Sequence, residues 1–94
     1  MRFLIRARMP VETGNAMVKN PKFLQEIEEY MRNIRAEAAY FFEMGGERTM
    51  AFIADMPDAH MMPSIAEPLF QKFNAKVELH PVMLLEDLKK ALQK

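Results

Sequence analysis

The chain has 94 residues, which is enough for one small domain (residues 1–94), and half of them are hydrophobic. Its 13 basic and 13 acidic side chains give a formal net charge of zero, so no overall positive field attracts nucleic acid or an anionic membrane. The sequence contains no cysteine, which excludes disulfide bonds, cysteine-ligated zinc and a thiol nucleophile. Because so small a domain buries a limited share of its surface, assembly with a second chain is favoured.

The first segment, residues 2–9, alternates apolar residues with others and is followed by Pro10, a pattern typical of a β-strand. Its charges, Arg2, Arg6 and Arg8, are spread among the apolar residues, whereas a signal peptide places charge ahead of an unbroken apolar run. No apolar run approaches the length of a membrane span. We therefore expect a cytoplasmic protein that has no membrane contact.

The next two segments differ in how clearly their sequences indicate secondary structure. Residues 11–19 fit either a loop or a short helical turn, because they contain Gly14 and Asn15. Asn20 and Pro21 then fit the N-cap and first position of a helix. Three-and-four spacing of apolar residues predicts that this helix is amphipathic. Its apolar residues are Phe23, Leu24, Ile27, Tyr30, Met31 and Ile34.

The stretch "AAYFFEMGGERTMAFIADM" predicts a β-hairpin, because two apolar runs flank Gly45-Gly46. Two adjacent glycines suit a two-residue turn in which both residues have positive φ. Closing the hairpin there pairs residues whose numbers sum to 91, which sets Tyr40 opposite Ala51. It also sets Glu43 opposite Arg48, and we expect that pair to help fix the register.

The second half of the chain predicts a helix over residues 58–73. The helix should start near Pro63, kink at Pro68 and end at Asn74 in a left-handed cap. Its apolar stripe consists of Ile65, Ala66, Leu69, Phe70 and Phe73.

The stretch "KVELHPVML" predicts a fourth strand, which Pro81 places at a sheet edge or a bulge. The ending "LEDLKKALQK" has acids first and lysines last, as the helix dipole favours. We expect a short terminal helix docked through Leu85, Leu88 and Leu92.

The predicted order is β-α-β-β-α-β plus a terminal helix, which indicates a ferredoxin-like α+β fold with an antiparallel sheet and both main helices on one face. The strand parity leaves a second face, which we call the open face. Its residues are Leu4, Arg6, Arg8, Ala38, Tyr40, Phe42, Thr49, Ala51, Ile53, Asp55, Glu78 and His80. The open face is too apolar for bulk water and too charged for an ordinary core. This mixture favours a second sheet packed across it with a polar pocket between the sheets.

Two stretches, "EAAYFFEMGGERT" and "AEPLFQKFNAKVELHPVMLLEDL", resemble a bacterial family of small uncharacterised proteins. The resemblance runs from Gly14–Ala16 to the final helix. It implies the dimeric α+β-barrel version of the ferredoxin-like fold, which is similar to muconolactone isomerase, antibiotic-biosynthesis monooxygenases and stress-responsive barrel proteins. No catalytic motif of those enzymes can be placed on this sequence, so the resemblance implies fold and dimer and leaves activity open.

The stretch "MPDAHMMPSI" sets His60 among Met56, Met61 and Met62, a combination that could bind Cu(I). A metal site needs three or four fitted ligands, and the only other histidine, His80, lies on another element. Methionine also commonly fills gaps in cores and at helix starts. We therefore interpret the stretch as a helix entry and expect neither a metal nor a cofactor.

The better candidate site is the set Arg6, Tyr40, Glu78 and His80 on the open face. An imidazole beside a carboxylate can shuttle protons, which makes His80 a weak catalytic candidate, and an arginine can hold a carboxylate or enolate. The alternative is that these groups pair with one another, or with their copies across a dimer, and do no chemistry.

Nucleic acid is the remaining partner to consider, because RNA-recognition domains share this strand order. They stack bases on aromatic residues of the first and third strands. The corresponding open-face residues here are Leu4, Arg6, Thr49, Ala51 and Ile53, none of them aromatic. Two hypotheses remain: a homodimeric barrel that binds, and could transform, a small anionic organic molecule, and a non-catalytic assembly module without a ligand.

Overall fold

The structure, a computed structural model, describes residues 1–93 and has the α+β architecture that the sequence predicts. Its four strands form one antiparallel sheet in the order β2–β3–β1–β4. They are β1 (Arg2–Arg8), β2 (Ala38–Met44), β3 (Glu47–Asp55) and β4 (Lys76–Pro81). The helices are α1 (Val11–Lys19), α2 (Phe23–Ile34), α3 (Met62–Phe73) and α4 (Leu85–Leu92), with a 3-10 turn η1 (Ala59–Met61) before α3. No helix within residues 1–93 is long and apolar enough to cross a membrane.

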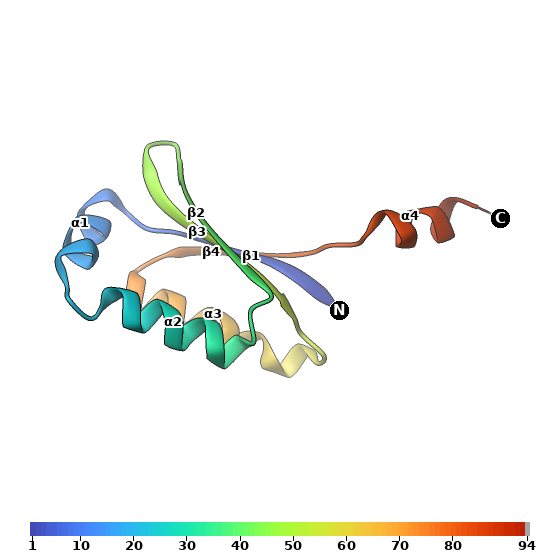
Figure 1. Cartoon of the computed structure of the whole chain (residues 1–94), viewed down its shortest axis with the longest axis horizontal. Coiled ribbons are helices and arrows are strands. Elements are labelled where there is room, and N and C mark those ends of the chain that lie inside the picture. Colours follow the sequence, from blue (N-terminus) through green and yellow to red (C-terminus); the bar gives the residue numbers. More distant parts are fainter. Residues whose placement is uncertain (94) are drawn as a thin grey trace.

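The core lies between the sheet and the pair α2 and α3, which cover one face of it (Figure 1). The ring of Tyr30 packs edge-on against Phe52, with centroids 5.1 Å apart, and its hydroxyl donates to the Ile65 carbonyl oxygen at 2.7 Å. Burial raises the pKa of Tyr30, so the hydroxyl keeps its proton and links α2 to α3. Phe41 points to the same side of the sheet, but it is 57% exposed because β2 is an edge strand.

The hairpin has the predicted register, with Tyr40 opposite Ala51, and both turn glycines have positive φ (56° and 81°). The predicted Glu43–Arg48 ion pair is wrong, although the two residues are opposite each other. Glu43 instead accepts from the turn N–H of Gly46 at 3.0 Å, and Arg48 donates to Asn15 at 3.0 Å. Glu43 thus binds a backbone N–H of its own turn, and Arg48 binds a residue of α1, in place of the pair across the two strands.

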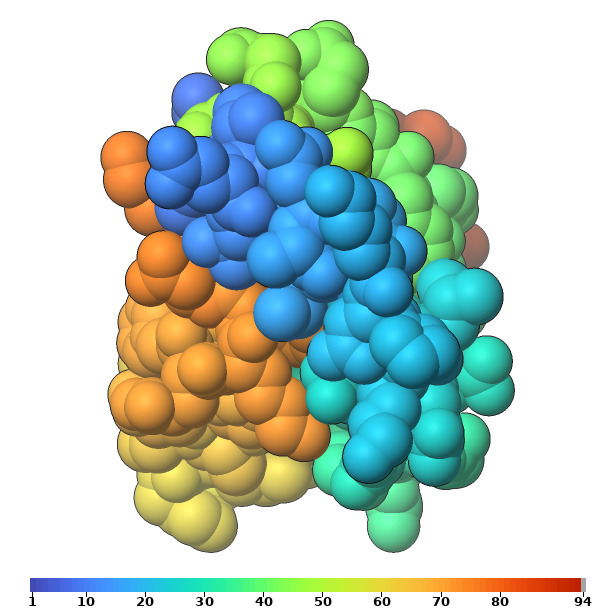
Figure 2. Space-filling model, turned by 90° about the vertical axis from the view of Figure 1, so that its left-hand side faces the viewer, coloured from blue at the N-terminus to red at the C-terminus, as the bar shows by residue number. Residues whose placement is uncertain are grey.

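Residues 11–19, which the sequence left open, form the helix α1. Figure 2 shows α1 (blue) across this end of the molecule, with α2 on one side and the orange α3–β4 region on the other. Gly14 is buried in α1 against the side chain of Arg48, and a Cβ there would lie 2.8 Å from Nη1. The prediction that Asn20 caps α2 was wrong: Asn20 Oδ1 accepts from the Lys22 N–H at 2.9 Å in a separate turn, and α2 begins at Phe23.

The second half follows the prediction in part. The helix expected over 58–73 is divided into η1 and α3, and α3 continues through Pro68. Asn74 has the expected left-handed cap (φ 50°). The fourth strand is an edge strand as Pro81 predicts, and it ends at Pro81, although the Val82 N–H still donates to the Arg2 carbonyl oxygen at 3.0 Å.

The docking of α4 on its own chain is the prediction that the structure contradicts most directly. None of the α4 residues, 85–92, is buried, and the helix projects from the end of the sheet beyond β4 (Figure 1). The three residues 82–84 that connect it to β4 lead away from the core. The leucines expected to dock are therefore uncovered within one chain.

Candidate functional site

The open face brings together three of the four predicted site residues. Arg6 on β1 faces Glu78 on β4, and its Nη2 donates to Glu78 Oε1 at 2.5 Å. His80, two residues further along β4, places Nε2 at 2.9 Å from the same Oε1. Alternate residues of a strand share a face, so a single carboxylate oxygen holds an arginine and an imidazole side by side.

Tyr40 lies on the same transverse row but is not in contact with this cluster. The row runs from Tyr40 to Ala51, to Arg6 and to Glu78 across all four strands. Two strand spacings, about 10 Å, separate the backbones of Tyr40 and Arg6. Ala51, a small residue, lies between them in this row.

The electrostatics of the cluster centre on Glu78. The hydrogen bond from Arg6, followed by that from His80, holds the pKa of the Glu78 carboxyl below its usual value. The carboxylate is therefore ionised at neutral pH. Arg6 is 27% exposed and His80 is half exposed, so both groups remain accessible in a single chain.

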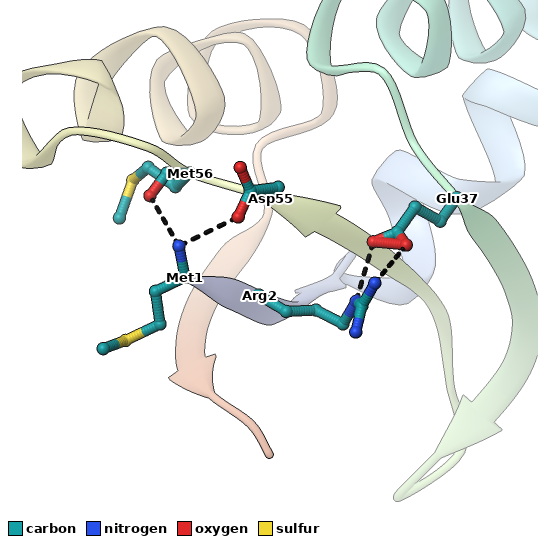
Figure 3. Close-up of polar contacts among 5 residues, drawn as sticks. All are labelled: Met1, Arg2, Glu37, Asp55 and Met56. Atoms are coloured by element: carbon teal, nitrogen blue, oxygen red, sulfur yellow. Dashed lines mark hydrogen bonds and ion pairs between the residues drawn. The ribbon is translucent and has the colours of Figure 1, made fainter. Parts of the chain in front are cut away.

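Two further arginines of β1 each have a carboxylate partner of their own. Arg2 binds Glu37, which precedes β2, through two hydrogen bonds of 2.8 Å (Figure 3). This pair raises the pKa of Arg2 and lowers that of Glu37. On the open face, Arg8 donates to Glu47 at 2.6 Å. The guanidinium groups along β1 are thus compensated one by one.

The rest of the open face is largely apolar. Tyr40 is 61% exposed and Phe42 is exposed as well, whereas Leu4 and Ile53 are half-buried. Thr49 is buried although strand parity places it on the open face, and its hydroxyl donates to the Glu47 carbonyl oxygen at 3.1 Å. Exposed aromatic residues around a charged centre are typical of a surface that meets a partner.

The methionine-rich stretch does not gather around its histidine. His60 lies in η1, exposed, with Nδ1 at 2.9 Å from Asp58 Oδ1. Met56 is buried in the core, while Met62 is exposed. The backbone N–H of His60, and then its side chain, lower the pKa of Asp58, which caps this turn.

One feature was missed by the sequence reasoning: an apolar groove between α2 and the hairpin. Its volume is about 490 Å³. It is lined by Met9, Phe23, Leu24, Ile27, Glu28, Met31, Phe41, Phe42, Arg48, Thr49 and Met50. The sequence held one indication of this groove. Leu24 and Phe41 belong to apolar patterns, but the topology places no other element of residues 1–93 over them. The four predicted site residues do not line this groove.

Comparisons with models of protein families and with characterised proteins each found no match to this chain.

Proposed function

We propose that the chain forms a homodimer through its open face and binds a small anionic organic molecule between the two sheets. The element order and the placement of α2 and α3 on one face support a ferredoxin-like reading of the fold. Two such sheets packed across their open faces form the dimeric α+β barrel that the resemblance to small barrel proteins implies. The aromatic exposure of Tyr40 and Phe42 supports the same contact.

The observation that carries the proposal is the shared carboxylate of Glu78. One oxygen of Glu78 holds the Arg6 guanidinium and the His80 ring side by side on an accessible face, so an anion bound by the guanidinium would lie beside the imidazole. Tyr40, which lies beyond Ala51 in the same row, offers an aromatic ring and a hydroxyl group to the rest of the ligand. This arrangement suits a compact carboxylate or enolate.

Within the proposal, the same contacts support a chemical role for His80. When Nε2 donates its hydrogen to Glu78, the tautomer is fixed and Nδ1 is left as the acceptor. Nδ1 then removes a proton from, or returns one to, a ligand held by Arg6. His80 is the candidate for proton transfer, and Arg6 positions the anion.

A second candidate function is an assembly module that binds no ligand. It is favoured by the pairs Arg2–Glu37 and Arg8–Glu47, because an arginine that already has its carboxylate has little need of an external anion. In this case the Arg6–Glu78–His80 cluster is part of the interface network.

The variants Arg6→Ala and His80→Ala separate the two functions, with Arg2→Ala as a control on the same strand. Benzoate binding, measured by calorimetry, should weaken about ten- to a hundred-fold in Arg6→Ala and stay unchanged in Arg2→Ala. Light scattering should give about twice the chain mass for all three. An Arg6→Ala or His80→Ala protein that is monomeric and melts about 5 °C or more below wild type would support the assembly module.

A further inference from the structure

The terminal helix α4 carries an uncovered apolar stripe. Leu85, Leu88 and Leu92 lie at helical spacing on one side, and they are 66%, 42% and 73% exposed. Lys89 borders the stripe on one side, whereas Asp87 lies toward the opposite face of the helix. An amphipathic helix with this pattern is built to pack against another surface.

Helix formation in α4 also depends on such a surface. Its sequence favours a helix: the Asp87 carboxylate accepts from the Leu84 N–H at 3.1 Å, acids begin the helix and lysines end it. An eight-residue helix nevertheless has too few hydrogen bonds to offset the cost of nucleation in water. Tertiary packing of the leucine stripe must supply the difference.

The groove between α2 and the hairpin is the apolar surface that matches it. Leu24 on one wall is 70% exposed, and Phe41 faces it from β2. Glu28 lies on the α2 wall and Arg48 on the hairpin wall. Glu28 is opposite in charge to Lys89, so a helix lying in the groove with its leucines inward can place Lys89 beside the α2 wall.

The α4 of the same chain cannot reach this groove. β4 ends at Pro81, opposite Phe3, whereas the groove is lined by Met9 at the other end of β1. Six residues of extended chain, about 20 Å, separate those two ends. The connection 82–84 spans at most about 10 Å. An α4 helix in this groove would therefore come from another molecule.

We propose that α4 of a second copy of this chain docks in the groove between α2 and the hairpin. If two copies exchange their α4 helices, each helix fills the groove of the other copy, and the pair forms a closed twofold dimer. This contact lies mainly on the helix-covered side of the hairpin, although Phe42 and Thr49 of the open face also line the groove. It goes beyond the proposed open-face dimer because its main wall is α2, and it is tested separately from that dimer.

The absence of cysteine in the chain allows a clean cross-linking test. Leu88→Cys and Leu24→Cys are placed on separate chains of different tag length, mixed and exposed to mild oxidation. A disulfide joining the two tagged chains should form at least ten times faster than in the control mixture of Leu88→Cys with Glu29→Cys. Glu29 is an exposed residue of α2 that points away from the groove.

Equal rates with Leu24→Cys and Glu29→Cys would overturn the proposal. Faster cross-linking of Leu88→Cys to Tyr40→Cys would overturn it as well, because α4 would then cover the open face. Failure of Arg6→Ala to alter benzoate binding bears on the ligand site and leaves this cross-link unaffected, so the two proposals fail separately.

Discussion

At the scale of single residues, two of the carboxylates that pair with arginines of β1 each accept more than one hydrogen bond. Glu78 accepts from Arg6 and His80 through one oxygen, and Glu37 accepts twice from Arg2. The Arg6–Glu78 pair joins the neighbouring strands β1 and β4, whereas the Arg2–Glu37 pair spans β3 to reach the residue before β2. Ion pairs at such accessible positions contribute little to stability. Their consequence is chemical: they set which groups are charged and how the imidazole is oriented.

The pH dependence of Glu78 follows from its two donors. Because its pKa in the folded chain is lower than the ordinary 4.5, its contacts stabilise the fold above about pH 4.5. This contribution is lost as the pH falls through the folded pKa. By NMR titration, Arg6→Gln should raise the pKa of Glu78 toward 4.5, and more than His80→Gln does, since Arg6 is the stronger cause.

The matched control is Arg2→Gln, which removes the same charge from the same strand. It should raise the pKa of Glu37 and leave that of Glu78 unchanged. A Glu78 carboxyl that titrates at its ordinary value in the wild-type protein would show that the Arg6–Glu78–His80 cluster does not form in solution.

At the scale of elements, the end of α2 shows how local backbone strain can be tested. Arg35 terminates α2 with φ 55°, a left-handed conformation that costs a non-glycine residue about 1–2 kcal/mol. Glycine avoids this strain but loses about 0.5–1 kcal/mol through the entropy of the unfolded chain. Arg35→Gly should therefore raise the free energy of unfolding by about 0.5–1 kcal/mol, measured in urea.

Arg32→Gly, one turn earlier in the same helix, is the control. Its backbone is helical, in the last turn of α2, so glycine should lower the free energy of unfolding by about 0.5–1 kcal/mol. If both variants were destabilised alike, the left-handed cap at Arg35 would be wrong.

Element types, strand parity and hairpin register could be predicted because they depend on local patterns: alternation in β1, three-and-four spacing in α2, and the Gly45-Gly46 turn. The Arg6–Glu78 neighbourhood also followed, since parity and topology determine which side chains share a row. The partners of Glu43 and the extent of α4 packing did not follow, because they depend on which surfaces compete for the same side chain. The sequence pattern indicates that the apolar side chain of Leu88 packs against another surface, but it does not indicate which chain provides that surface.

At the scale of the whole molecule, the chain is more extended than a compact domain. Its radius of gyration is 14.8 Å, against about 12 Å expected for this length, and its extents are 53 × 28 × 18 Å. The projecting α4 accounts for the long dimension (Figure 1). One chain thus leaves three apolar surfaces uncovered: the open face, the groove and the α4 stripe.

The central claim, that two copies meet through their open faces, is tested most directly by isotope-filtered NMR on a mixture of labelled and unlabelled chains. Tyr40 and Phe42 belong to the open face, as do the half-buried Leu4 and Ile53. We expect intermolecular nuclear Overhauser effects between the Leu4 or Ile53 methyl groups of one copy and the Tyr40 or Phe42 ring of the other. A spectrum at millimolar concentration with no intermolecular effect to any of these four residues would contradict the claim.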